Sequence, residues 1–73
     1  MKAKDMFEKL GYKQEVRDDY IEYYLDGIDY PFGYYHYILF DLKNKCWKSN
    51  LEGTSDEEEL AINQQVKELH WND

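Results

Sequence analysis

The side chains that most often carry out catalysis are few in this chain and do not form pairs. His36 alternates with tyrosines in "YYHYILF", and His70 lies near the predicted end of a helix, where a cation would complement the helix dipole. A lone histidine without a positioned partner does not define an acid–base pair. Both histidines are therefore predicted to be structural or solvated, and no catalytic residue is assigned.

Metal and cofactor sites also lack their usual spacing. Cys46 is the only cysteine, and it stands at no metal-ligand spacing from either histidine, so we expect no zinc site. The acidic run Asp56–Glu59 lacks the alternating oxygen ligands and central glycine of a calcium loop. The glycines are isolated, and none makes a phosphate-binding loop. The sequence predicts a non-enzymatic protein without a cofactor or metal.

Length and charge narrow the class of partner. The 73 residues suffice for one domain, 1–73, with a thin core, because a chain of this size buries only about 60% of the surface it exposes when unfolded. The formal net charge of −7 disfavours direct nucleic-acid binding, which depends on Lys and Arg, although Lys43, Lys45 and Lys48 form a small basic patch. The single cysteine, the charged start "MKAKDMFEKLGY" and the lack of a run of roughly 20 apolar residues predict a cytoplasmic protein that does not span a membrane.

Hydrophobic spacing and turn residues predict five elements. A helix is expected from Ala3 to Leu10 before Gly11, followed by strands at Tyr20–Leu25, Tyr34–Phe40 and Cys46–Leu51 and a helix at Asp56–His70. Ser55 and Glu58 have the spacing of a capping box at the start of the second helix. The predicted fold class is α+β, in the order α-β-β-β-α. The three strands form an antiparallel sheet with both helices packed on one face.

The hairpin between the last two strands is predicted from "DLKNK". Asp41 suits the first position of a type I turn, and Asn44 tolerates the left-handed backbone that a four-residue loop requires. With this turn we expect Cys46 to share a face with Ile38, and Trp47 to lie on the opposite face.

Strand alternation divides the many aromatic residues between two sheet faces. The face with Ile21, Leu25, Ile38 and Phe40 is expected to form the core under the helices. The opposite face is the predicted partner-binding surface, made of Tyr20, Tyr24, Tyr35, Tyr37, Leu39 and Trp47. The alternative is that these rings are structural and half-buried, covered by residues around Tyr12 or Tyr30.

An acidic protein with an aromatic face suggests three uses. In the first, it is an inhibitor or adaptor that docks the aromatic face onto a protein. In the second, it mimics nucleic acid through carboxylates, either Asp18, Asp19, Glu22, Asp26 and Asp29 or the helix row Glu57, Glu58 and Glu59, and its binding would weaken with salt. In the third, it self-associates, for example as a homodimer. Stacking of single-stranded bases on the tyrosines is opposed by the charge balance.

The two ends of the chain carry a resemblance. "KAKDMFEKLGY", the hairpin "FDLKNK" from Phe40 to Lys45, and "AINQQVKELHW" resemble segments of a family of small uncharacterised proteins carried by phages and prophages of Gram-positive bacteria. The resemblance implies a phage origin and a place in the host cytoplasm, and it offers no catalytic residue to transfer. It also favours interference with host machinery, including nucleic-acid-guided defence, as the general role. For the mimic alternative, the expected target is a DNA- or RNA-binding defence protein of a restriction or CRISPR system.

Overall fold

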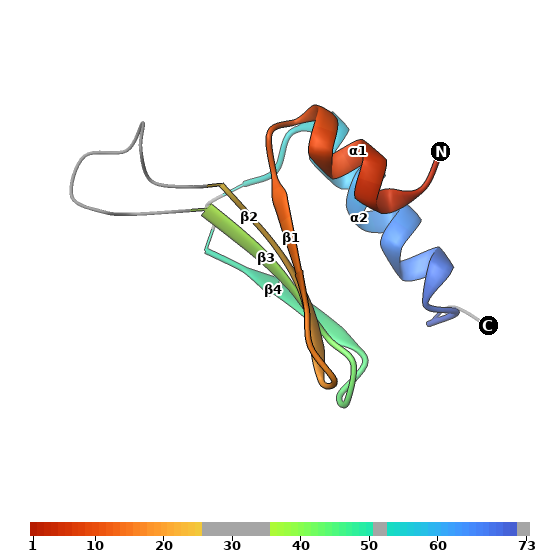
Figure 1. Cartoon of the computed structure of the whole chain (residues 1–73). Helices are drawn as coiled ribbons and strands as arrows, with labels where there is room; N and C mark the ends of the chain where they lie inside the picture. Colours follow the sequence, from red (N-terminus) through yellow and green to blue (C-terminus); the bar gives the residue numbers. More distant parts are fainter. Residues whose placement is uncertain (26–35, 51–52, 72–73) are drawn as a thin grey trace.

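The computed structural model describes residues 1–25, 36–50 and 53–71. In these ranges the chain forms α1 (Ala3–Lys9), β1 (Lys13–Val16), β2 (Tyr20–Leu25), β3 (His36–Asp41), β4 (Cys46–Ser49) and α2 (Asp56–Glu68). The strands form an antiparallel sheet in the order β1-β2-β3-β4, and both helices lie on one side of it (Figure 1). The predicted α+β class is confirmed, but the described sheet has four strands where three were predicted.

The strand that the prediction missed is β1, which follows α1 almost directly. It pairs with β2 so that Val16 lies opposite Ile21. The backbone N–H of Arg17 donates to the carbonyl oxygen of Tyr20 at 2.8 Å, which closes a tight turn centred on Asp18 and Asp19. Aspartate favours such turns, so Asp18 and Asp19 form the β1–β2 turn as well as carrying surface charge.

The predicted start of α2 is confirmed, and its end lies slightly earlier than predicted. The Ser55 hydroxyl accepts from the Glu58 backbone N–H at 3.1 Å, and the Ser55 N–H donates to Glu58 Oε1 at 2.8 Å, which together form the capping box. At the other end His70 adopts a φ of 60°, and the N–H of Trp71 returns to the carbonyl of Val66. This reversal stops the helix at Glu68 and brings the Trp71 ring within 6.1 Å of the Phe40 ring.

The core lies between the helices and the face of the sheet that they cover. Phe7 of α1 stacks on Tyr23 of β2 with ring centroids 3.9 Å apart, and it meets Tyr12 and Phe40 edge-on. Aromatic contacts of this kind bury large areas and add specific geometry. The buried set is Ala3, Phe7, Tyr12, Tyr23, Ile38, Phe40, Ala61 and Ile62.

A chain of polar groups runs through this core. The Tyr23 hydroxyl donates to Oε1 of Gln65 on α2 and accepts from Nε2 of Gln14 on β1 at 3.1 Å. Gln65 is only 5% exposed, so its side chain depends on this hydrogen bond to replace water. These hydrogen bonds therefore link the helix α2 and the edge strand β1 to β2.

Two predictions at the β3–β4 hairpin are wrong. The Asp41 turn is present, since Asp41 Oδ1 accepts from the backbone N–H of Lys43 and Asn44, but the left-handed residue is Lys45, with φ 54°. The loop pairs Asp41 with Cys46 and Phe40 with Trp47. Residues that pair across antiparallel strands point to the same side. Trp47 therefore shares the helix side with Phe40, and Cys46 lies on the other face.

Other predictions fall outside the described residues. They concern the expected turn at Asp26 and Gly27, the ends of two predicted strands at Tyr34 and Leu51, and the predicted contact residue Tyr35.

Removing the Tyr23 hydroxyl tests the polar chain. Tyr23→Phe is expected to lower the free energy of unfolding by about 1–3 kcal/mol, because the Gln65 amide would remain buried without its partner. Tyr23→Phe combined with Gln65→Leu should cost less than the sum of the two single changes, as measured by urea unfolding. Strictly additive costs would contradict the coupling.

Candidate functional site

The sheet face away from the helices carries a cluster of half-buried side chains. We call it the open face and define it by Tyr20 and Tyr24 of β2 with Tyr37 and Leu39 of β3. Tyr24 lies directly opposite Tyr37, and Leu39 lies opposite Glu22. Within the described residues no helix lies on this side of the sheet (Figure 1). The four side chains therefore form one neighbouring group on the two central strands.

Charged residues border the open face on both sides. Lys13 and Glu15 of β1 lie opposite Tyr24 and Glu22, and Lys48 of β4 lies opposite Leu39. An aromatic centre with a polar margin is the arrangement found in protein–protein interfaces. The open face is thus suited in composition to a macromolecular contact.

Two carboxylates oppose each other at this margin. Glu15 and Glu22 are cross-strand partners, and partial burial together with the charge of Glu15 raises the pKa of Glu22. Glu15 is paired in turn with Arg17, whose Nη2 lies 2.6 Å from its Oε1. The like charges cost stability, since neighbouring carboxylates on one face repel.

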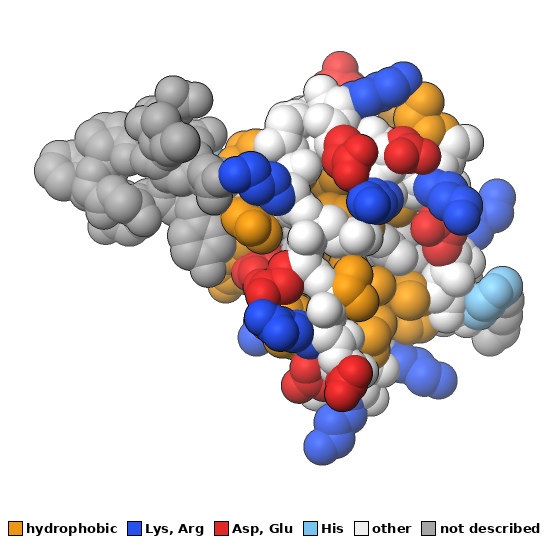
Figure 2. All heavy atoms as spheres, viewed as in Figure 1, with side chains coloured by type: hydrophobic (Ala, Val, Ile, Leu, Met, Phe, Trp, Pro, Cys, Tyr) orange, Lys and Arg blue, Asp and Glu red, His pale blue; other side chains and the backbone are white. Residues whose placement is uncertain are grey.

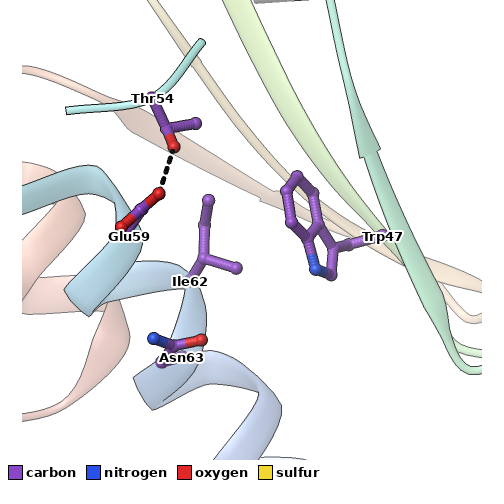
Figure 3. A pocket seen from close by; sticks show the side chains of 5 residues that line it. All are labelled: Trp47, Thr54, Glu59, Ile62 and Asn63. Atoms are coloured by element: carbon purple, nitrogen blue, oxygen red, sulfur yellow. Dashed lines mark hydrogen bonds between the residues drawn. The ribbon is translucent and has the colours of Figure 1, made fainter. Parts of the chain in front are cut away.

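A second surface lies on the helix side, between β4 and α2. Trp47 is 42% exposed there and faces Ile62 across a hollow of about 300 Å³ (Figure 3). Thr54, Glu59 and Asn63 line the rest, and the Thr54 hydroxyl donates to Glu59 Oε1 at 3.3 Å. We call this hollow the β4–α2 groove. It combines one aromatic wall with one carboxylate.

The three acidic residues predicted as one surface have different environments. Glu57 borders an apolar hollow of about 210 Å³ between the helices, beside Leu10 and Leu60. Glu59 lines the β4–α2 groove, and Glu58 is turned inward. Figure 2 shows that on the visible face acidic and basic side chains are interspersed. The acidic excess therefore does not form a continuous field on that side.

Glu58 has a structural role. Its carboxylate closes the capping box with Ser55 and accepts a hydrogen bond from the Tyr12 hydroxyl. Burial acts to raise the pKa of Glu58, but the hydrogen bonds from Ser55 and Tyr12, with the nearby His36, hold that pKa below its ordinary value. Its charge thus stabilises the contact between α2 and the residue preceding β1.

The structure brings together four of the six predicted contact residues. Tyr20, Tyr24, Tyr37 and Leu39 share the open face, whereas Trp47 lies in the β4–α2 groove and Tyr35 is outside the described residues. The prediction missed the groove residues Thr54, Ile62 and Asn63. Pairing Asp41 with Cys46 across the predicted four-residue loop would have placed Trp47 on the helix side and pointed to them.

Other candidate chemistries find little support in the described parts of the chain. No group of three or more His, Cys, Asp or Glu side chains there is arranged to hold a metal ion. Cys46 is exposed on the edge strand. Among the helices that the structure describes, none has the length and apolar character needed to cross a bilayer.

Comparisons with known proteins give no match: no family model, no curated protein and no solved structure corresponds to this chain. The resemblance to phage proteins stays a prediction. The open face and the β4–α2 groove are the features of the described structure that bear on function.

Removing the charge of Glu22 tests how much the repulsion between Glu15 and Glu22 lowers the free energy of unfolding. Because the folded state raises the pKa of Glu22, the protonated carboxyl favours folding, and this contribution is lost as pH rises through that pKa. Glu22→Gln is therefore expected to raise the free energy of unfolding at pH 7 by about 0.5 kcal/mol, with less difference from the wild type at pH 4. Chemical unfolding at both pH values measures this.

Glu57→Gln is the matched control for charge removal. Glu57 lies in the first turn of α2, where a carboxylate complements the helix dipole, so its loss should lower stability slightly. An equal gain from both substitutions would show that only the net charge matters and would contradict the local repulsion.

Proposed function

We propose that this protein is a non-enzymatic inhibitor or adaptor that binds another protein through its open face. The observation that carries the proposal is the group of Tyr20, Tyr24, Tyr37 and Leu39, half-buried on the two central strands and away from both helices. The tyrosines are not required to complete the core, because Tyr23, Ile38 and Phe40 on the other face are at most 1% exposed.

The chemistry of these side chains supports a protein partner. Tyrosine is among the residues enriched at the energetic centres of interfaces, where it contributes a large area and a hydroxyl at small entropic cost. The neighbouring charges of Lys13, Glu15 and Lys48 can set orientation at the margin. The net charge of −7 favours partners with a basic surface.

Mimicry of nucleic acid is the alternative proposal, and it has less support. A mimic needs a row of outward-facing carboxylates, but Glu58 is engaged with Ser55 and Tyr12. Lysine and arginine side chains also interrupt the acidic ones on the face seen in Figure 2. Self-association is opposed by the equal charge of two copies.

Paired substitutions on the open face test the proposal. Tyr24→Thr with Tyr37→Thr keeps strand-forming residues while removing two adjacent rings, and it is expected to weaken partner binding by about 100-fold or more. The partner is first captured with the tagged wild type from bacterial lysate at low and high salt, and affinities are then measured by calorimetry. Trp47→Thr, on the other side of the sheet, is the control and should retain this partner.

Several results would contradict the open-face proposal. An unchanged affinity in the folded double variant would exclude these tyrosines. Capture that disappears at high salt and depends on Glu57 and Glu59 would indicate the mimic instead. A doubled solution mass that the double variant abolishes would identify a second copy as the occupant. If the variant unfolds, the rings belong to the core, and the proposal fails.

A further inference from the structure

One row of side chains crosses the helix side of the whole sheet. It runs from Val16 through Ile21 and Phe40 to Trp47. Phe40 is fully buried, whereas Val16 and Trp47 at the two edges are 60% and 42% exposed. An exposed tryptophan on an edge strand is costly in solvent, and such side chains often mark contact sites.

The strand that carries Trp47 lies at an edge of the sheet. In the described part of the chain the strand order ends at β4, whose one neighbour there is β3. Extended peptides bind proteins by adding to such an edge, with alternate side chains entering pockets beside it. The β4–α2 groove is a pocket in that position (Figure 3).

The groove defines the chemistry of what it would hold. Trp47 and Ile62 form apolar walls, and Glu59 supplies a carboxylate beside Thr54. A carboxylate has more acceptor sites than the single Thr54 hydroxyl uses. A cationic side chain therefore complements Glu59, and the chain's net charge of −7 adds long-range attraction for a basic segment. A second copy of this acidic chain would instead be repelled.

We infer that the β4–α2 groove binds an extended segment of another protein, which adds to the sheet along β4 and directs a Lys or Arg side chain to Glu59. This surface lies across the sheet from the open face, so the inference goes beyond the proposed function. Strand alternation fixes the recognised pattern. One side chain packs on Trp47, the side chain two positions along reaches Glu59, and the one between them lies beside Lys48 on the other face.

The predicted recognition pattern is therefore apolar, acidic, basic. The acidic residue matters because Lys48 would otherwise deter strand addition, as lysines on edge strands do. Either strand direction presents the same alternation to the two faces, but the order of the three residues along the peptide reverses with the direction.

The test selects ligands from a random dodecapeptide display library on the full chain. Enriched peptides are expected to contain an apolar residue, an acidic residue and a Lys or Arg in succession, in either order. Trp47→Ala should weaken their binding about 10-fold or more, and Glu59→Gln about threefold with a reduced salt dependence. Val16→Ala, at the opposite edge of the same row, is the matched control and should leave affinity unchanged.

Two further measurements locate the peptide. In ¹H–¹⁵N spectra the indole N–H signal of Trp47 should shift on titration, while that of Trp71, which packs on Phe40, should not. The backbone amides of the bound peptide can be methylated at its odd or at its even positions. One of these two sets should abolish binding and the other should preserve it, because only every second peptide residue is hydrogen-bonded to β4.

Each contrary outcome overturns the inference. Failure to enrich peptides, peptides without the three-residue pattern, or peptides that bind Trp47→Ala as tightly as the wild type would each exclude the groove. A doubled solution mass that Trp47→Ala abolishes would show that a second copy occupies it. Peptide binding that is lost in the folded Tyr24→Thr/Tyr37→Thr variant would place the peptide on the open face instead, whereas retained binding is the expected result.

Discussion

The structure depends on Tyr23, which connects both helices to the sheet. Its ring stacks on Phe7 of α1 at 3.9 Å, and its hydroxyl is hydrogen-bonded to Gln65 of α2 and Gln14 of β1. A residue in a strand can direct its side chain to only one face. Both helices are therefore held on the same side, and among the described residues no helix covers the other face.

Both candidate surfaces follow from this one-sided cover. The helices bury the central strands, where Ile38 and Phe40 are fully enclosed. Burial is less complete at the edge strand β4, where Trp47 is partly exposed. On the reverse side Tyr24 and Tyr37 lie opposite each other and are half-buried. Both surfaces therefore combine aromatic side chains with incomplete burial.

The elements with strong local signals could be predicted from sequence, and those defined by pairing could not. The Ser55–Glu58 capping box locates the start of α2, and apolar spacing with Gly11 locates α1. β1 was missed because "KQEV" is mostly polar, as an edge strand beside solvent can be. Trp47 was placed on the wrong face because the predicted pairing register differed by one residue, which reverses every side chain of a strand. The contact of Tyr12 with Glu58 joins residues 46 positions apart and has no local signal.

Alternation along β4 links the two surfaces. Trp47 and Ser49 point to the helix side, while Lys48 between them lies at the margin of the open face, opposite Leu39. A strand added along β4 would therefore place half of its side chains in the groove and extend the open face with the other half. The groove and the open face are thus separated by a single residue step along β4, from Trp47 to Lys48.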